Sequence, residues 1–191
     1  MGLKESFKAF NESENFWVGL IRDFIFVILA VTIFASISYV ALGLWTPMVA
    51  VESGSMIPHI QIGDIIFVES IDRTQVITYE TGRKIGYASF DDYGDVILYR
   101  PYGRPGVTPI IHRAMYYVEQ GDSMWPDGPA APHAGYITKG DNIYTNPYYD
   151  QQGSISFNQP IKKEWIIGVA RFYRVPILGY VSLIPRKMLG V

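Results

Sequence analysis

The feature that most constrains this chain is a long uncharged apolar run near its N-terminus. From Phe24 to Leu44 the sequence reads FIFVILAVTIFASISYVALGL, and the next charged residue is Glu52. About 20 apolar residues suffice to cross a bilayer as a helix, whereas the apolar region of a cleaved signal peptide has only about 7 to 15. Trp17 and Trp45 flank the run, as aromatic residues do at the two faces of a membrane. The run therefore predicts a transmembrane anchor.

The basic residues around this run predict its orientation. No Lys or Arg follows the run before Arg73, whereas three precede it, at Lys4, Lys8 and Arg22. Because Lys and Arg concentrate on the cytoplasmic side, we expect a single-pass protein of the cell membrane with its N-terminus in the cytoplasm. The expected division of the chain is a cytoplasmic segment at 1–23, a transmembrane anchor at 24–45 and an extracytoplasmic β domain at 46–191.

Composition excludes several functions. The chain of 191 residues has 18% charged residues and a net charge of -2, so it carries no basic footprint for nucleic acid. It contains no cysteine, which excludes disulfides, thiolate nucleophiles and cysteine-based metal sites. We expect no cofactor and no metal. The histidines that remain as candidates for proton transfer are His59, His112 and His133.

The part of the chain after the anchor reads as one β domain. Short apolar or β-branched runs alternate with turn-rich stretches, and no stretch shows a sustained helical period. Strands this short need several partners, so the expected fold class is mostly β, with an antiparallel barrel-like or sandwich-like domain. The polar segment 73–93 is expected to be an insertion loop or hairpin. The expected strands are IIFV from 65, QVITY from 75, VILY from 96, PIIHRAMYYV from 109, GYIT from 135 and WIIGVARFYRV from 165.

A second apolar stretch, WIIGVARFYRVPILGYVSLIP, ends the domain but does not suit a second transmembrane helix. Arg171 and Arg174 lie at its centre and Pro176 follows them. A charge at the middle of a membrane costs about 3 kcal/mol even on permissive scales. We expect a strand followed by a tail that lies on a surface.

Two stretches share a Ser-Met-x-Pro pattern, and one of them is expected to hold a nucleophile. A serine hydroxyl is inert unless a positioned base accepts its proton. Ser55 follows Gly54, which permits an unusual backbone angle, and precedes Pro58, which stiffens the chain before a strand. Ser123 instead leads into DGPAAPHAG, a loop too rich in Pro, Ala and Gly to hold a side chain rigidly. We therefore predict that Ser55 is the nucleophile.

The partners of Ser55 are a histidine and a carboxylate. His112 lies within PIIHRAMYYV, and a strand can hold an imidazole as rigidly as proton transfer requires. His59 and His133 are expected to be ordinary polar residues. A carboxylate that orients the imidazole could be Asp141 or Asp150, since both follow the histidine strand at a distance that a turn can fold back. Spacing alone does not separate these two.

Five short blocks occur in order between Ser55 and Gly179. Together they resemble the type I signal peptidases of the archaeal and endoplasmic-reticulum kind. The blocks are Ser55-Met-Ile-Pro with Gly63-Asp64, then Gly94-Asp95-Val-Ile, Ile-Ile-His112-Arg, Thr-Lys-Gly-Asp141-Asn, and Gly168-Val-Ala-Arg with Pro176 and Gly179.

The resemblance implies a serine endopeptidase that removes signal peptides from exported proteins at the outer face of the membrane. Ser55 is then the nucleophile and His112 the general base. Bacterial relatives have a lysine at the position of His112, and Lys139 of this chain does not occupy that position. The hydroxyl of Ser53 matches one that assists the backbone N–H of Ser55 in holding the oxyanion, and such a donor contributes about 3 kcal/mol.

The resemblance also bears on the third catalytic residue. Members of the family usually have Gly-Asp-Asn-Asn with a second aspartate six residues after the first, and that second aspartate completes the triad. Here Ile143 replaces the second asparagine, position 147 is proline, and the next aspartate is Asp150. An alignment with a loop longer by three residues makes Asp150 the triad acid and leaves Asp141 to tie down its turn.

The expected partners are preproteins that carry signal peptides and the lipid bilayer, and no nucleic acid. Two other readings remain open. One is a membrane-anchored protease dedicated to a single surface precursor, and the other is a non-catalytic anchored β domain that binds exported chains. The second would lack a member of the triad.

Overall fold

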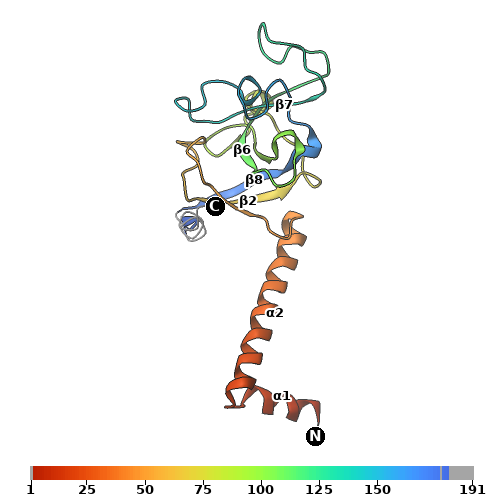
Figure 1. The fold of residues 1–191 in the computed structure, drawn as a ribbon, viewed down its shortest axis with the longest axis vertical. Helices are drawn as coiled ribbons and strands as arrows, with labels where there is room; N and C mark the ends of the chain where they lie inside the picture. Colours follow the sequence, from red (N-terminus) through yellow and green to blue (C-terminus); the bar gives the residue numbers. More distant parts are fainter. Residues whose placement is uncertain (1, 177, 181–191) are drawn as a thin grey trace.

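The computed structural model describes residues 2–176 and 178–180. A short helix, α1 (Leu3–Asn11), leads into a long helix, α2 (Phe16–Leu42), at whose far end the β domain lies (Figure 1). The chain therefore has two parts of different character, a helical stalk and a folded β domain.

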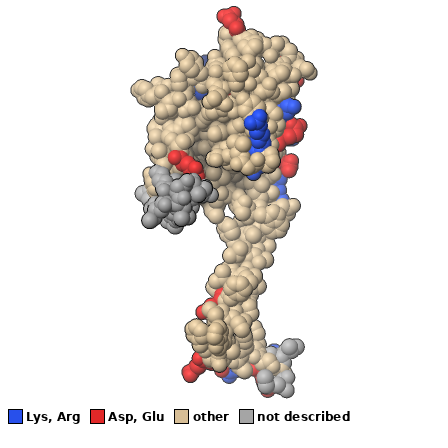
Figure 2. Space-filling view, viewed as in Figure 1, with Lys and Arg blue, Asp and Glu red and all other residues tan. Residues whose placement is uncertain are grey.

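The helix α2 covers most of the predicted anchor at 24–45, but it begins earlier, at Phe16, and ends earlier, at Leu42. Asn15 caps its first turn by accepting a hydrogen bond from the backbone N–H of Trp17, and Gly43 ends it with a positive φ of 74°. Within the described residues α2 is the one helix long and apolar enough to cross a membrane. On the face seen in Figure 2, charged side chains lie at the N-terminal end of the stalk and on the domain but not on the shaft between them.

Six of the described strands form the main sheet, and five of them match the runs expected from 65, 96, 109, 135 and 165, whereas the strand at 48–50 was not predicted. Their order is β1-β2-β8-β5-β6-β7, and every neighbouring pair runs antiparallel. The prediction of a mostly β, antiparallel domain is therefore confirmed. Among the described strands the sheet is sandwich-like and does not close into a barrel, since β1 and β7 remain its edges. The strands are β1 (Met48–Ala50), β2 (Ile65–Ser70), β5 (Val96–Tyr99), β6 (Ile110–Val118), β7 (Gly135–Lys139) and β8 (Ile166–Val175).

Smaller elements occupy the connections between these strands. The polar segment 73–93 forms a helix and then a two-stranded hairpin, so a hairpin is present there as expected. Three 3-10 turns also occur among the described residues. These elements are α3 (Tyr79–Ile85), β3 (Ala88–Ser89), β4 (Asp92–Tyr93), η1 (Pro101–Gly103), η2 (Asp150–Gln152) and η3 (Lys163–Trp165).

The predicted strand QVITY at 75–79 is wrong. The backbone there is irregular, because the carboxylate of Asp95 accepts the N–H of Ile77 at 2.7 Å in place of a neighbouring strand. Helix α3 then begins at Tyr79, capped by the side chain of Thr78 and ended by Gly86 with a φ of 75°. With seven residues α3 makes about two turns, too few for a helical period to be visible in the sequence.

The C-terminal stretch begins as the sequence predicts, with a strand. In β8, Arg171 forms ion pairs with Glu69 of β2 at 2.9 Å and with Asp95, next to β5, at 2.7 Å. These contacts hold the three central strands together at one level of the sheet. The predicted surface tail falls largely on residues 177 and 181–191, which lie outside the described residues.

We predict that Gly168→Ala destabilises the domain, because β8 passes very close to β2 at this residue. A Cβ at position 168 would clash with the carbonyl oxygen of Glu69, and that oxygen belongs to backbone that cannot swing away. Forcing two central strands apart should cost about 2 kcal/mol of unfolding free energy, measured by thermal unfolding in detergent.

The matched control for this prediction is Gly153→Ala. Its Cβ would meet only the carbonyl oxygen of Asp150, at 3.9 Å, and its φ of -109° suits any residue. Equal unfolding temperatures for the two variants would contradict the account of β8.

Candidate active site

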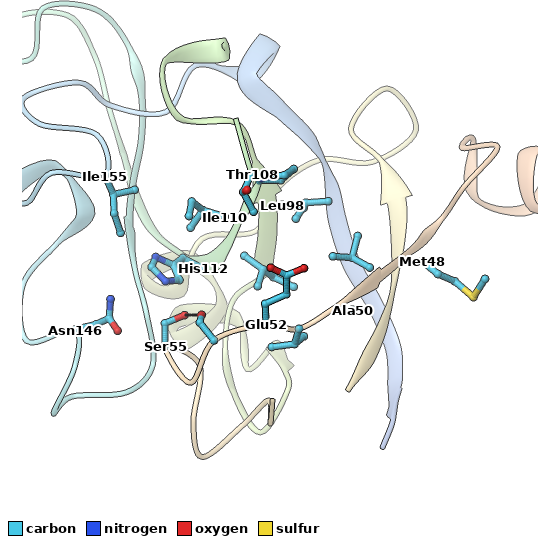
Figure 3. Close-up of a pocket in the computed structure, with 15 residues that line it drawn as sticks. Met48, Ala50, Glu52, Ser55, Leu98, Thr108, Ile110, His112, Asn146 and Ile155 are labelled. Carbon is cyan, nitrogen blue, oxygen red and sulfur yellow. Dashed lines mark hydrogen bonds between the residues drawn. The ribbon is translucent and has the colours of Figure 1, made fainter. Parts of the chain in front are cut away.

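A groove of about 610 Å³ lies beside the sheet, lined by β1, the loop that follows it and the first residues of β6. Ser55 and His112 both line the groove toward one end, whereas Ala50 and Met48 lead toward α2 at the other (Figure 3). Between these ends the lining is mainly apolar, with Leu98 among its side chains. An extended chain lying in the groove would reach Ser55 through mostly apolar surroundings.

His112 is buried in β6, and a carboxylate contacts its imidazole. Pairing with Ile97 of β5 fixes its backbone, and its side chain is 2% exposed. Nδ1 of His112 lies 2.7 Å from Oδ2 of Asp150, the first residue of η2. The structure thus brings His112 and Asp150 together, and it places Asp150 rather than Asp141 against this ring.

The carboxylate of Asp150 is ionised despite its burial. Burial by itself raises the pKa of Asp150, but the charge of His112 and hydrogen bonds from His112, Thr138 and Tyr99 outweigh it, so that the pKa is lowered. An ionised carboxylate only accepts hydrogen bonds, and Nδ1 of His112 must therefore be the donor. In the neutral ring Nε2 then carries no proton and can accept one.

Three residues around Asp150 were not identified from the sequence. The hydroxyls of Tyr99 and Thr138 donate to the same Oδ2 that His112 contacts, at 2.8 and 2.6 Å. Gln151 accepts the backbone N–H of Thr138 at 3.0 Å and donates to its hydroxyl at 3.3 Å. This leaves the hydroxyl hydrogen of Thr138 directed at Asp150. In the sequence, only the position of Gln151 directly after Asp150 indicated that Gln151 could lie near this carboxylate.

The turn that carries Ser55 is anchored by its neighbours in the core. Met56 and Ile60 are completely buried, so the turn cannot shift without disturbing the packing. The unusual backbone angle expected at Gly54 is not found, since Gly54 is not among the residues with positive φ. Ser53 and Ser55 face each other, with 3.3 Å between their hydroxyl oxygens. The two serines therefore reach the same end of the groove.

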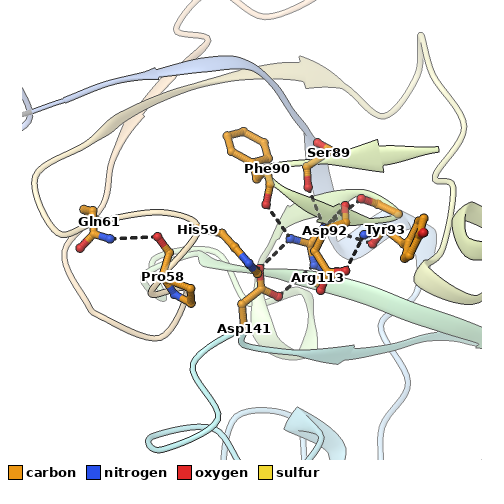
Figure 4. Close-up of polar contacts among 10 residues, drawn as sticks. Pro58, His59, Gln61, Ser89, Phe90, Asp92, Tyr93, Arg113 and Asp141 are labelled. Carbon is orange, nitrogen blue, oxygen red and sulfur yellow. Dashed lines mark hydrogen bonds and ion pairs between the residues drawn. The ribbon is translucent and has the colours of Figure 1, made fainter. Parts of the chain in front are cut away.

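Asp141 lies in a separate cluster from Asp150. Arg113, the residue after His112, donates from Nε at 2.9 Å and from Nη2 at 2.6 Å to the two carboxylate oxygens of Asp141 (Figure 4). Nδ1 of His59 lies 2.7 Å from Oδ2 of Asp141. Asp141 thus links the strand that carries His112 to the turn that carries Ser55.

The residues on either side of Asp141 contact the backbone of Ser55. The N–H of Asn142 donates to the carbonyl of Ser55, and the side-chain amide of Asn142 donates to the carbonyl of Gly54, both at 2.8 Å. A Cβ on Gly140 would lie 2.6 Å from the carbonyl oxygen of Ser55, so only glycine allows this approach. The turn at 140–142 therefore fixes the Ser55 turn from outside the core.

Ser123 and His133 lie elsewhere and belong to loops. The hydroxyl of Ser123 is within hydrogen-bond distance of the carbonyls of Trp125 and Gly128, so it closes its own turn. The ring of His133 contacts Ala134 and Gln159 through its two nitrogens. Among the described residues no group of three or more His, Cys, Asp or Glu side chains could hold a metal ion.

Comparison with known proteins finds several relatives that carry the same name. No protein-family model matches the chain. A signal peptidase complex catalytic subunit from Schizosaccharomyces pombe is 31% identical over 142 residues, covering 72% of the chain and 66% of that protein. The subunit of the same name from Komagataella phaffii is 30% identical over 142 residues, covering 73% of the chain and 66% of that protein. The one from Candida albicans is 26% identical over 170 residues and covers 81% of the chain and 82% of that protein.

We predict that Asp141→Asn lowers thermal stability. Arg113 is 1% exposed, and losing the carboxylate would leave a buried guanidinium without its counter-charge. The expected loss is about 3 kcal/mol of unfolding free energy, measured by thermal unfolding in detergent. Asp72→Asn, which makes the same change at an exposed side chain, is the control and should unfold at the wild-type temperature. Wild-type stability in Asp141→Asn would contradict the structural role of this cluster.

Proposed function

Because the chain belongs to the type I signal peptidase family of the endoplasmic-reticulum kind, we propose that it is a membrane-anchored serine endopeptidase that removes signal peptides from exported preproteins. The observation that carries the proposal is the His112–Asp150 pair beside Ser55 at one end of the groove. The aligned region spans about two thirds of the first two relatives described above. The activity, substrates and partners of the whole protein are therefore part of this proposal.

The proposed reaction depends on the direction of the hydrogen bond between His112 and Asp150, in which Nδ1–H donates to the carboxylate. Ser55 Oγ attacks the scissile carbonyl while Nε2 of His112 accepts the hydroxyl proton. The carboxylate of Asp150 holds the ring through Nδ1–H and stabilises the imidazolium that forms. His112 then gives its proton to the departing amine, and water hydrolyses the acyl-enzyme by the same steps. The overall reaction consumes one water molecule for each peptide bond and requires no cofactor.

Ser53 is proposed to help stabilise the oxyanion. Its hydroxyl lies 3.3 Å from the hydroxyl of Ser55, close enough for a donor on the same side of a bound carbonyl. Together with the backbone N–H of Ser55 it would supply two donors for the negative oxygen. Removing one such donor costs about 3 kcal/mol of transition-state stabilisation.

The position of the groove close to helix α2 favours a substrate that is itself held in the membrane. The groove begins at β1, which follows α2 after a short connection, so the proposed site stays close to the end of the anchor. A preprotein held by its signal segment would meet Ser55 by diffusion within the bilayer, which favours productive orientation. We propose a cytoplasmic N-terminus and a β domain on the opposite side of the membrane. Because the relatives are named subunits of a complex, accessory subunits belong to this proposal.

We predict that Ser55→Ala, His112→Ala and Asp150→Asn each abolish cleavage of a preprotein. Ser55→Ala removes the nucleophile and His112→Ala the base. Asp150→Asn leaves an amide beside Nδ1 and should cost about 10⁴ in rate with the fold preserved. The measurement is incubation of the detergent-solubilised protein with several unrelated preproteins, followed by N-terminal sequencing of the products.

Ser123→Ala and His133→Ala are matched controls, because these side chains only brace loops. Both should retain cleavage after a small-x-small site. Cleavage of a single precursor among many would favour a dedicated protease. No cleavage by the folded wild-type protein, or full activity in Ser55→Ala, would overturn the proposed chemistry.

A further inference from the structure

A loop with exposed apolar side chains borders the groove at the end where Ser55 lies. The loop runs from Asn142 to Tyr149, between β7 and η2. Its exposed large apolar side chains are Ile143 at 66%, Tyr144 at 91% and Tyr148 at 69%. Three large, mainly apolar side chains on one short loop present a surface for another molecule to cover.

The loop is held in place at both ends. At its start, Asn142 contacts the carbonyls of Gly54 and Ser55, and the N–H of Asn146 donates to the carbonyl of Asn142 at 2.7 Å. At its end, the ring of Tyr149 packs edge-on against Tyr116 with 5.6 Å between ring centroids. The exposed side chains therefore extend from a loop tied directly to the turn of the proposed nucleophile.

The loop is continuous with the groove. Asn146, between Tyr144 and Tyr148 in the chain, lines the groove together with Ser55. Figure 3 shows Asn146 on the opposite side of Ser55 from Ala50 and Met48, which lead toward the stalk. The order along the site is thus β1, then Ser55 with His112, and then the loop.

This order assigns a direction to a substrate. A precursor held in the bilayer by its signal segment approaches from the side of α2, so the residues before the scissile bond lie along β1. The residues after the scissile bond must leave on the other side of Ser55, past Asn146. Tyr144 and Tyr148 lie two residues before and two residues after Asn146 in the chain.

We propose that the loop 142–149 binds the first residues of the mature part of the preprotein, on the leaving side of the scissile bond. The proposal rests on the proposed function. The occupant is an extended polypeptide whose apolar and aromatic side chains lie against Ile143, Tyr144 and Tyr148. Tyrosine suits this role because its large, stiff ring covers apolar surface while its hydroxyl bonds to a passing backbone.

The first experiment places a photoreactive p-benzoylphenylalanine at position 144 in full-length protein that also carries Ser55→Ala. Because this protein does not cut, the preprotein stays intact during irradiation. The expected crosslinks join position 144 to residues just after the cleavage site. Crosslinks confined to the signal segment, to lipid or to a second copy of this chain, or no crosslink to a preprotein that still binds, would overturn the proposal.

The second experiment measures kcat/KM for two preproteins that differ only in the first five mature residues, which are either apolar and aromatic or all Gly and Ser. Tyr144→Ser combined with Tyr148→Ser should lower kcat/KM about tenfold for the first and little for the second. Ile85→Ser, at a 64% exposed residue of α3, is the control and should change neither. An equal effect of the double variant on both preproteins would contradict the proposal.

The two experiments separate this proposal from the proposed function. If the wild-type protein cleaves both preproteins but the double variant does not distinguish them, the loop proposal fails alone. If the wild-type protein cleaves neither, the proposed function fails and the crosslinks from position 144 decide whether the loop still binds exported chains.

Discussion

The arrangement of the site depends on the contact between the turn at 140–142 and the backbone of Gly54 and Ser55. Among the described strands, β1 and β7 are opposite edges of the sheet and share no hydrogen bonds. The chain segments that follow these two edges nevertheless meet, because Asn142 donates to the carbonyls of Gly54 and Ser55. This contact places a serine that follows one edge strand in the groove that is also lined by a histidine on β6, the neighbour of the other edge strand. The groove therefore combines residues from both ends of an open sheet.

Two aspartates that look alike in the sequence have different environments around this contact. Asp141 neutralises a buried arginine and contacts His59, so its charge is used to hold two backbone segments together. Asp150 contacts His112 and two hydroxyl donors at a single oxygen, which keeps it ionised and polarises the imidazole. We infer that Asp141 sets where Ser55 and His112 lie, whereas Asp150 orients the ring through Nδ1. Substitution of Asp141 should therefore mainly lower stability, whereas substitution of Asp150 should mainly lower the rate of cleavage.

Most of the helices and strands could be predicted from the sequence where a hydrophobic pattern repeats over neighbouring residues. The apolar run predicts a helix that could cross a membrane, and alternating β-branched runs predict the strands, because burial repeats with the period of each element. Helix α3 could not be predicted, since about two turns carry no visible period and Asp95 replaces a strand partner at 77. The contacts of Gln151 with Thr138 and of Asn142 with Gly54 depend on how distant segments fold together. No spacing in the sequence encodes them.

We propose that Asp150 holds His112 with a proton on Nδ1, which leaves Nε2 to accept the proton of Ser55. Selective nitrogen-15 labelling of histidine and NMR in detergent test it directly, because the chain has only 3 histidines and a His112→Gln variant identifies the signal. When the ring is neutral, we expect that Nδ1 of His112 is protonated and that this preference is lost in Asp150→Asn. A neutral His112 that carries its proton on Nε2, or one unaffected by Asp150→Asn, would contradict it.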